Sequence, residues 1–374
     1  MSPLPDVFDV FIVGGARTPM TGFVGALKDV SALELGAIAA RGAFDKTGIK
    51  PAWVDHVIIG NVLQTSADAV YGARHVALEA GVPVEVPALT VNRLCGSGIQ
   101  AAISGAQLIQ LGEANIVLTG PLEDSLLEGL RDSYCDCTMA ITAENAAAKY
   151  GITRTEQDAY ALRSQQLAAR AWAEGRFSEE IVPVEIRTRK SVEIVHRDDH
   201  LRPETTIDGL AELPPAFKKD GTVTAGNASG IVDGGAALIL ASAAALDRNG
   251  VRPIGKLLGW AVCGVEPTLM GMGPAPATRA VLKKLKLTLD DVDLIEVNEA
   301  FAAQYLAVEK DLGLDRNKVN VNGGAIALGH PLGMTGTRLL LTLVLELRRR
   351  GGKRGLAAAC IGGGQGIAAI VEAI

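Results

Sequence analysis

Two cysteines and one histidine, each in a glycine-rich segment, are the residues best suited to chemistry. Cys95 lies in CGSG, His330 in GHPLG and Cys360 in CIGGG. A thiolate can attack a carbonyl carbon and carry the acyl group, an imidazole can take up a thiol proton near neutral pH, and a second thiol can exchange another proton. Small neighbours leave room for a bulky electrophile. The three residues therefore predict acyl transfer through a cysteine.

Cys95 stands between an apolar strand expected at 87–92 and an alanine-rich helix that runs to about Gly112. At the start of a helix, amide groups and the helix dipole favour the thiolate. Two alternatives stay open. A cysteine with small neighbours is often packed in a core, and Gly96–Ala101 also fits the G-x-G-x-x-A pattern of dinucleotide-binding turns. The strand after that pattern, 114–120, ends without the acidic residue that would bind a ribose.

His330 and Cys360 also lie at expected turns. A glycine and a proline flank the histidine and fix its backbone, and Gly362–Gly364 follow the cysteine. Three successive amides in a bend predict a cradle for an oxyanion. Ordinary packing in the core is the alternative for both residues. Asn298, in NEAF, follows an expected strand. It is either a residue of this site or the N-cap of a helix.

The composition of the 374 residues excludes several classes of protein. The net charge is −6, which disfavours a nucleic-acid-binding surface, and the longest apolar stretches are shorter than the ~18–20 residues that span a bilayer. Five cysteines without paired CxxC motifs predict no metal cage and favour a reducing compartment. The N-terminal segment has no Lys or Arg before its apolar run, so we expect a strand rather than a targeting peptide, and a cytoplasmic location.

Apolar segments alternate with capped helices along the first part of the chain. Segments 9–15 and 56–62 are expected strands, and Ser31 with Glu34 forms a capping box for a helix that ends at Gly48. This order of strands and helices predicts an α/β fold with a parallel sheet.

The character of the sequence changes at about residue 121. Charged helices follow, one with a capping box at Thr153 and Glu156, and then short β-rich segments and a polar loop. Beyond residue 252 the alternation of strands and helices returns. We therefore expect an N-terminal half (1–120 with 229–252), an inserted domain (121–228) and a C-terminal half (253–374).

The two flanking parts resemble each other. In the first, Asn92 and CGSG precede an alanine-rich helix and the strand IVLTG; in the second, Asn322 and GHPLGMTG precede a leucine-rich helix at 337–350 and the strand LAAAC. This similarity predicts two α/β halves related by duplication. Their glycine-rich turns would then meet near a pseudo-twofold axis, where a functional site is expected.

Four motifs identify a family. NRLCGSG, VNEAFA, GGAIALGHPLG and CIGGGQGIA, in this order, resemble the thiolase family, and the similarity extends over nearly the whole chain. The stretches GNVLQTSADAVYGARHVAL, LEDSL and LPPAFKKDGTVTAGNASG are most similar to 3-ketoacyl-CoA thiolases of the mitochondrial and bacterial type. The resemblance implies a thiolase fold, with two duplicated α/β halves packed in layers and an inserted α+β loop domain that binds CoA.

The resemblance also implies an activity, the reversible thiolytic cleavage of a 3-ketoacyl-CoA by CoA in fatty-acid β-oxidation. Cys95 would attack the 3-keto carbon and release acetyl-CoA, and CoA would then take the acyl group. His330 would take the proton of Cys95 and later that of CoA, and Cys360 would protonate the departing acetyl-CoA carbanion. The enolate oxygen would lie against His330 and a water held by Asn298, and the thioester oxygen would accept from the amides of Cys95 and Gly362.

Further contacts are implied for the substrates, CoA and acyl-CoA. Ser229 and Ala225 would lie near the pantetheine, and three residues would lie toward the nucleotide: Phe217, Arg202 and Leu130. The acyl end would be lined by Met139, Met270, Ala300 and Phe301. For Arg202 a solvated charge is the alternative interpretation. No cofactor and no metal are implied.

Three departures from the family pattern modify these expectations. After 117–120 the usual glycine-rich segment with an acidic residue and a Met-Ser pair is missing, either because the loop is short or because the sequence lacks a disordered stretch. That segment commonly helps tetramers to form, so we expect a homodimer, with a homotetramer as the alternative. Thr138 replaces a histidine that acetoacetyl-specific members often carry, which disfavours a strictly biosynthetic role. Thr335 replaces a common serine, and we expect a mild effect.

Other activities stay as alternatives. A biosynthetic acetyl-CoA acetyltransferase would use the same residues to condense two acetyl-CoA molecules. A ketoacyl synthase shares the nucleophilic cysteine but pairs it with two histidines or a histidine and an asparagine, so Cys360 favours a thiolase. A non-catalytic CoA-binding relative would be expected to lack one of Cys95, His330 and Cys360, and all three are present. A nicotinamide-dependent enzyme is the least favoured.

Overall fold

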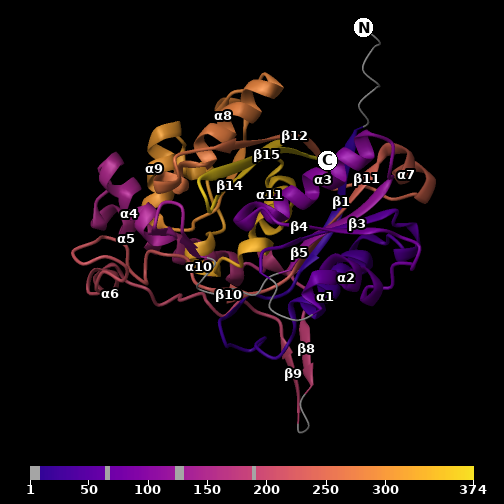
Figure 1. Cartoon of the computed structure of the whole chain (residues 1–374), viewed down its shortest axis with the longest axis horizontal. Helices are drawn as coiled ribbons and strands as arrows, with labels where there is room; N and C mark the ends of the chain where they lie inside the picture. Colours follow the sequence, from indigo (N-terminus) through magenta and orange to yellow (C-terminus); the bar gives the residue numbers. More distant parts are fainter. Residues whose placement is uncertain (1–8, 64–67, 123–129, 188–190) are drawn as a thin grey trace.

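The computed structural model describes residues 9–63, 68–122, 130–187 and 191–374. In Figure 1 a large sheet runs through the middle of the molecule. The helices α8 (Pro274–Leu285) and α9 (Ala302–Leu312) lie at the upper left, and α1 (Ala32–Thr47) and α2 (Gly72–Glu79) lie at the lower right. Most of the LEDSL motif, which follows the point where a segment is expected to be missing, lies outside the described residues.

One nine-stranded sheet carries the fold, in the order β13-β14-β15-β12-β1-β11-β5-β3-β4. The expected strands at 9–15, 56–62 and 114–120 are β1, β3 and β5. The bounds of the strands are β1 Val10–Arg17, β3 His56–Asn61, β4 Ala88–Val91, β5 Ile116–Leu122, β11 Ala236–Ser242, β12 Gly255–Gly264, β13 Leu294–Val297, β14 Arg354–Ile361 and β15 Gln365–Ala373.

The two halves of this sheet repeat one pairing pattern. β3 pairs in parallel with β5, and β11 and β1 follow in antiparallel order. In the other half β13 pairs in parallel with β14, and β15 and β12 follow in antiparallel order. β1 and β12 join the halves through an antiparallel contact at Phe11 and Ile12. The equivalence confirms the expected duplication.

The expectation of a parallel sheet is wrong in part. Within the nine-stranded sheet, β3 is parallel to β4 and β5, and β13 is parallel to β14, whereas the other strand pairs are antiparallel. β14 and β15 form a hairpin, because the glycines at 362–364 allow a tight turn with left-handed φ angles of 77° and 80° at Gly363 and Gly364. A glycine run that was interpreted only as a site feature therefore also reverses the chain.

Three large hydrophobic cores separate the layers. The middle core joins α3 and α11 with both halves of the sheet. One outer core packs α1 and α2 on the first half, and the other packs α8 and α9 on the second. The layers therefore follow one another in this order: α1 and α2, the first half of the sheet, α3 and α11, the second half of the sheet, and α8 and α9. The bounds of these helices are α1 Ala32–Thr47, α2 Gly72–Glu79, α3 Ser97–Gln110, α8 Pro274–Leu285, α9 Ala302–Leu312 and α11 Leu332–Arg350.

Both predicted capping boxes are present. Ser31 and Glu34 cap α1, which ends at Gly48 with a φ of 72°. Thr153 and Glu156 cap α5 (Arg154–Ala173) in the same way. These local signals set the helix ends because each box satisfies amides that the helix itself leaves without partners.

α11 begins earlier than the sequence predicts. Its N-cap is Pro331 and its first residue is Leu332, whereas the glycines in GHPLGMTG led to an expected start at 337. Close crossing of α3 and α11 explains the glycines. A Cβ at Gly336 would lie 2.7 Å from the Ile99 amide nitrogen, and one at Gly98 would lie 2.5 Å from that of Thr337. The glycines serve helix contact here rather than a loop.

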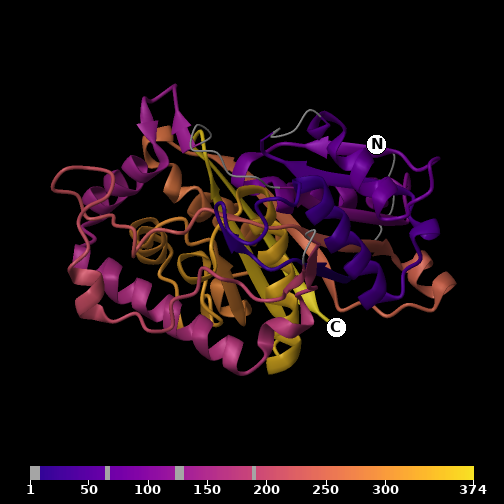
Figure 2. The ribbon, with the colours of Figure 1, turned by 90° about the horizontal axis from the view of Figure 1, so that it is seen from below.

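The remaining elements lie outside the nine-stranded sheet. They are the helices α4 Met139–Tyr150, α5, α6 Ile207–Ala211, α7 Ala243–Asn249 and α10 Ala325–Leu328, and the strand pairs β2–β10 (Thr21–Gly22, Val232–Asp233), β6–β7 (Arg131–Asp132, Cys137–Thr138) and β8–β9 (Val184–Arg187, Val192–Val195). The β8–β9 hairpin projects from the body in Figure 1, and the β6–β7 hairpin projects at the upper left of Figure 2. Among the described residues, none of the helices has the length and apolarity that crossing a bilayer requires.

Candidate active site

A cavity of about 320 Å³ brings three of the predicted catalytic residues together, whereas Asn298 and Gly362 are not among its lining residues. Cys95, His330 and Cys360 all line it, although they come from three distant segments of the chain. Seven of the predicted substrate residues line it as well: Leu130, Met139, Phe217, Ser229, Met270, Ala300 and Phe301. Residues of both duplicated halves and of the inserted segment therefore line the same cavity.

Cys95 lies in a single 3-10 turn, η3 (Leu94–Gly96), between β4 and α3. The preceding residue, Leu94, has a φ of 45°, in the left-handed region that a leucine rarely adopts. Asn92 Oδ1 accepts from the Leu94 amide at 2.9 Å, and Ser97 Oγ donates to the Leu94 carbonyl at 2.7 Å. These side chains hold the sharp turn that presents the thiol to the cavity. The expectation that Cys95 begins the helix is corrected, since α3 starts at Ser97.

The imidazole of His330, just before α11, has a partner at each ring nitrogen. Nδ1 lies 2.6 Å from Thr335 Oγ1, and Nε2 lies 3.1 Å from Asn298 Nδ2. The Thr335 hydroxyl donates to the Pro331 carbonyl at 2.7 Å, so it accepts from Nδ1–H. Nε2 is then unprotonated and accepts from the Asn298 amide. These contacts select the neutral tautomer in which Nε2 is the basic atom.

Asn298 follows β13 and is fully buried. The next helix, α9, begins at Ala302 and has Phe301 as its N-cap, so the interpretation of Asn298 as a helix cap is wrong. In the described part of the chain its Oδ1 has no hydrogen-bond partner. An acceptor is therefore available beside His330 for a water or a substrate group.

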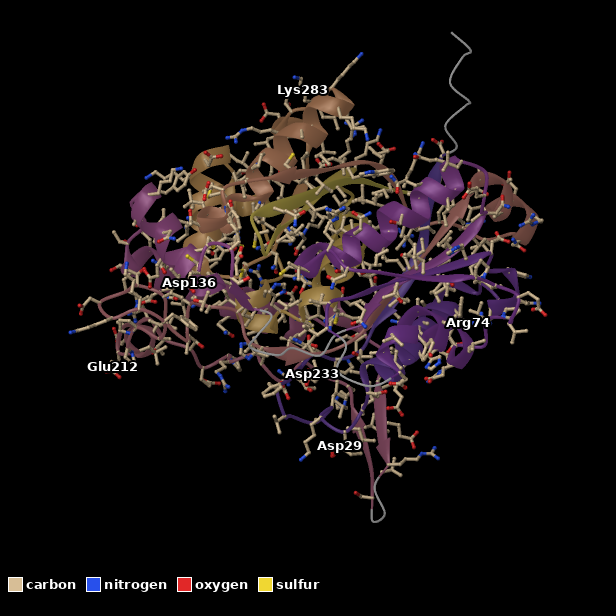
Figure 3. The ribbon with its side chains drawn as sticks, viewed as in Figure 1. Asp29, Arg74, Asp136, Glu212, Asp233 and Lys283 are labelled. Carbon is tan, nitrogen blue, oxygen red and sulfur yellow. The ribbon has the colours of Figure 1, made fainter. Side chains whose placement is uncertain are left out.

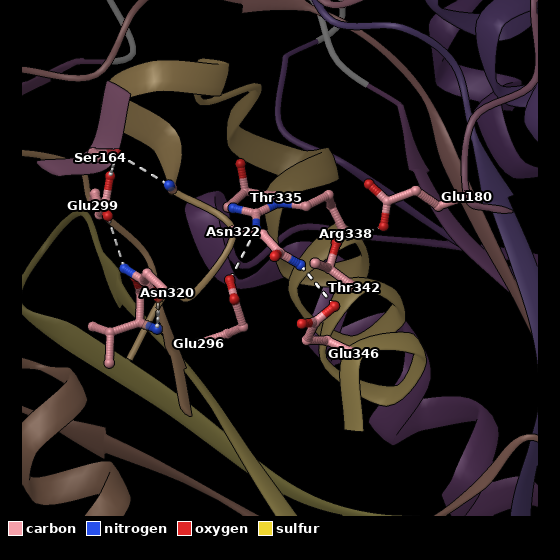
Figure 4. A network of polar contacts seen from close by, with 12 residues as sticks. Ser164, Glu180, Glu296, Glu299, Asn320, Asn322, Thr335, Arg338, Thr342 and Glu346 are labelled. Atoms are coloured by element: carbon pink, nitrogen blue, oxygen red, sulfur yellow. Dashed lines mark hydrogen bonds and ion pairs between the residues drawn. The ribbon is translucent and has the colours of Figure 1, made fainter. Parts of the chain in front are cut away.

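A buried carboxylate fixes the loop after β13. Glu299 Oε1 accepts from Tyr160 Oη at 2.7 Å and from Asn320 Nδ2 at 2.9 Å. Its Oε2 accepts from Ser164 Oγ at 2.7 Å and from the Ile326 amide at 3.1 Å. Figure 4 shows the carboxylate between Ser164 and Asn320. Sequence analysis missed this residue because its partners come from α5 and from two later segments.

A buried salt bridge links β13 to α11. Arg338 Nη1 donates to Glu296 Oε2 at 3.0 Å, as Figure 4 shows. Asn298 lies two residues after Glu296, and His330 lies just before α11. The salt bridge therefore holds together the two elements that carry the asparagine and the histidine.

Cys360 lies near the end of β14 and is only 1% exposed. Burial raises the pKa of its thiol, and negative charge on Cys95 raises it further. The thiol therefore stays protonated at neutral pH, as a proton donor must. A Cβ at Gly362 would lie 3.2 Å from Leu94, so the turn after Cys360 passes close to the turn that carries Cys95. The two backbone donors predicted for the thioester oxygen thus lie on neighbouring turns.

The burial of His330 gives the protein a pH-dependent stability. Burial, together with the positive charge of Arg338, lowers the pKa of His330 to about 3. The folded histidine then stays neutral between pH 6.5 and 3, whereas the unfolded one takes up a proton. Stability from this group is present above pH 6.5 and is lost as the pH falls toward 3, by about 2 kcal/mol at pH 5. Urea unfolding of wild type and His330→Asn at pH 7 and pH 5 measures it; equal losses in both proteins would contradict the assignment.

Two predicted substrate residues do not line the cavity. Ala225 and Arg202 are exposed, and Arg202 contributes its amide to Gln165 Oε1 at 2.9 Å. Phe217, expected toward the nucleotide, lines the cavity and stands edge-on to Phe301 with ring centroids 6.4 Å apart. The lining residues that sequence analysis missed as site residues lie within two positions of predicted ones: Thr138, Ala140, Ala228, Gly230, Ile231 and Leu332.

Comparisons with known proteins agree with this geometry. The family model of the thiolase N-terminal domain matches residues 10–125 and 121–244, and that of the thiolase C-terminal domain matches 251–373. The chain is 50% identical to human mitochondrial 3-ketoacyl-CoA thiolase over 97% of this chain and 98% of that protein. It is 48% identical to the acetyl-CoA acetyltransferase of Chromobacterium violaceum over 97% and 99% of the two chains.

A solved structure extends the comparison to the fold. The crystal structure of human mitochondrial 3-ketoacyl-CoA thiolase in complex with CoA matches with a TM-score of 0.95 at 48% identity, and the match covers 98% of each chain. Family models, relatives and fold agree over nearly the whole length. The chain belongs to the thiolase family.

Proposed function

We propose that Cys95, His330 and Cys360 carry out the reversible cleavage of a 3-ketoacyl-CoA by CoA, which yields acetyl-CoA and a shortened acyl-CoA. This is the acyltransferase activity of a thiolase, and a 50% identical relative is named for it. One observation carries the assignment of roles. A thiol, a histidine in a fixed tautomer and a second thiol that stays protonated line the same cavity.

In the first half-reaction, His330 Nε2 takes the proton of Cys95 and the thiolate attacks the 3-keto carbon. The bond between the α and β carbons breaks, the acyl group stays on Cys95, and Cys360 gives its proton to the acetyl-CoA carbanion. Before CoA reacts, the proton on His330 passes to the Cys360 thiolate. In the second half-reaction His330 takes the proton of the CoA thiol, the CoA thiolate displaces the acyl group from Cys95, and the released Cys95 thiolate takes up the proton from His330. The raised pKa of Cys360 supports its role. The thiolate of a weakly acidic thiol is a strong base, so in the reverse, condensing direction the Cys360 thiolate can remove a proton from the α carbon of acetyl-CoA.

Two sets of donors stabilise the oxyanions in this proposal. His330 and Asn298, 3.1 Å apart through Nε2 and Nδ2, support binding of the enolate oxygen, directly or through a water held by Asn298. The amides of Cys95 and Gly362, on neighbouring turns, support binding of the thioester oxygen. Each such donor contributes ~3–4 kcal/mol to lowering the barrier.

Thr335 has a positioning role that can be tested by substitution. Thr335→Val keeps the shape but leaves His330 Nδ1–H without its acceptor, so the tautomer is no longer fixed. A buried donor left unsatisfied costs ~1–3 kcal/mol, so we expect kcat/KM to fall about 10-fold. Thr335→Ser keeps the hydroxyl and should stay within about twofold of wild type. Equal rates for the valine and serine variants would exclude the role.

The substrate assignments complete the proposal. CoA and acyl-CoA bind against the inserted domain, 121–228, with Ser229 and Phe217 at the cavity and Ala225 and Arg202 outside it. A relative solved in complex with CoA supports CoA as a ligand. No cofactor takes part. The proposal includes the division of the chain into an N-terminal half (1–120 with 229–252), an inserted domain (121–228) and a C-terminal half (253–374).

Steady-state rates of thiolysis across 3-ketoacyl-CoA chain lengths test the substrate class. We expect cleavage of acetoacetyl-CoA and of longer substrates, because Met139, Met270 and Phe301 form an apolar wall. The second candidate, condensation of two acetyl-CoA molecules, is favoured by the relative named acetyl-CoA acetyltransferase. Condensation without thiolysis of longer substrates would support that candidate instead.

We propose a homodimer that forms through β4. This strand is one edge of the nine-stranded sheet, and Leu89 on it is 48% exposed. Val70 and Tyr71 precede α2, which packs beside β4, and both are more than half exposed. An apolar edge strand suits pairing with a second copy. Light scattering should give the mass of two chains; a monomer would contradict the proposal, and four chains would indicate the homotetramer.

A cytoplasmic location stays a proposal. All five cysteines are thiols, as is usual in a reducing compartment. The human relative is named as mitochondrial, so cell fractionation in the source organism decides between cytoplasm and organelle.

A further inference from the structure

A second pair of cysteines, which the reaction does not use, lies at the tip of the β6–β7 hairpin. The segment reads Tyr-Cys-Asp-Cys from 134 to 137, and Asp132 pairs with Cys137 across the hairpin. Asp136, between the cysteines, has a φ of 50°, so the chain turns sharply there. Figure 3 labels Asp136 at the left of the molecule, and α4 begins at Met139, directly after β7. The turn brings two thiols together on a projecting part of the surface.

The thiol of Cys137 lies against the backbone of Cys135. Cys137 Sγ donates to the Cys135 carbonyl at 3.2 Å. Desolvation, and then the neighbouring Cys137 side chain, raise the pKa of Cys135. Both residues are partly exposed, whereas Cys95 is 9% and Cys360 1% exposed. A reagent in solution therefore reaches the hairpin thiols more easily than the catalytic ones.

We propose that Cys135 and Cys137 form a reversible disulfide by exchange with a small-molecule disulfide such as glutathione disulfide. One cysteine loses its proton and attacks a sulfur of the small disulfide, which releases one thiolate and leaves a mixed disulfide. The second cysteine then loses its proton, attacks the protein sulfur of that mixed disulfide and releases the second small thiolate. Two electrons pass from the cysteines to the small disulfide, and the released thiolates take up the two protons.

The hairpin joins this redox pair to the substrate cavity. Arg131 pairs with Thr138 at the base of the hairpin, and Thr138 and Leu130 line the cavity. Closure of a disulfide at the tip therefore constrains a segment that forms part of the substrate wall. Exposed disulfides are also more readily reduced than buried structural ones, so the bond should open again under reducing conditions.

Mass spectrometry of the whole protein in glutathione buffers of increasing oxidised fraction tests the proposal. After alkylation of thiols and tryptic digestion, Cys135 and Cys137 fall in one peptide, 132–149, with no other cysteine. We expect this peptide to escape alkylation and to lose the mass of two hydrogens, and dithiothreitol to restore it. As the oxidised fraction of glutathione is raised, the Cys135–Cys137 disulfide should form first, and thiolase activity should persist in the samples in which it first appears.

Two variants serve as controls. Cys137→Ser should give only a glutathione adduct on Cys135, because the second attack is not possible. Cys263→Ser, at another partly exposed cysteine, should oxidise like wild type. Three results would overturn the proposal: a stable glutathione adduct in wild type without ring closure, a bond from either hairpin cysteine to a cysteine elsewhere, or loss of activity before peptide 132–149 is oxidised.

Discussion

Replacing Cys95 by serine abolishes acyl transfer without unfolding the protein. We expect kcat/KM for thiolysis to fall by at least about 10⁴-fold, the order seen when the nucleophile of a covalent catalyst is removed. A hydroxyl is a far weaker nucleophile than a thiol at neutral pH, and His330, buried and neutral, is a weak base for it. Steady-state thiolysis of acetoacetyl-CoA measures the loss.

The fold of the Cys95 variant provides the control. The thiol lies in a turn held by Asn92 and Ser97 rather than by Cys95 itself, so the melting temperature should change little. Residual activity above about one hundredth of wild type would contradict the role of Cys95 as nucleophile. Inactivity together with unfolding would call for the same measurement on Cys95→Ala.

Replacing Glu299 by alanine has the largest expected effect on stability. The substitution leaves the Tyr160 hydroxyl, the Ser164 hydroxyl and the Ile326 amide without the acceptor that they have in a fully buried site. Asn320 Nδ2 loses one acceptor and keeps the Val297 carbonyl and Tyr160 Oη. An unsatisfied buried donor costs ~1–3 kcal/mol, so we expect a loss of about 4 kcal/mol or more in the free energy of unfolding. The midpoint of urea unfolding measures it.

Glu299→Gln is the matched control. The glutamine amide keeps the shape of the side chain and one acceptor oxygen. Its NH₂ group, however, faces N–H and O–H donors, and the backbone amide of Ile326 cannot rotate away from it. We expect a loss of about 2 kcal/mol, between wild type and the alanine variant. A loss below about 1 kcal/mol for Glu299→Ala would show that the network does not hold the loop. Because Asn298 is the neighbouring residue, the folded fraction of either variant should also turn over more slowly.

The catalytic set could be predicted from sequence because each member carries a local signal. Cys95, His330 and Cys360 each lie within two residues of a glycine, and the two halves repeat one order of motif, helix and strand. The starts of α1 and α5 could be predicted for the same reason, because all the hydrogen bonds of a capping box lie within four consecutive residues. The family resemblance then assigned roles that composition and spacing alone left open.

The contacts that hold the catalytic set could not be predicted, because they depend on packing between distant segments. The glycines at 333 and 336 indicated a loop, yet they lie inside α11 where it crosses α3, and only that helix brings Thr335 to His330. Glu299 gives no signal in NEAF, since its partners come from α5 and from residues 320–326. The direct contact of Asn298 with His330 likewise joins β13 to the start of α11.

The acyl-cysteine intermediate is tested most directly by acetyl-CoA labelling and mass spectrometry. Trypsin places Cys95 in peptide 94–131 and Cys360 in peptide 355–374, each with a single cysteine. After incubation with acetyl-CoA, the acetyl group should appear on Cys95, disappear on addition of CoA, and be absent in Cys95→Ala. An acetyl group on Cys360, or none on peptide 94–131 of the active protein, would contradict the proposed mechanism.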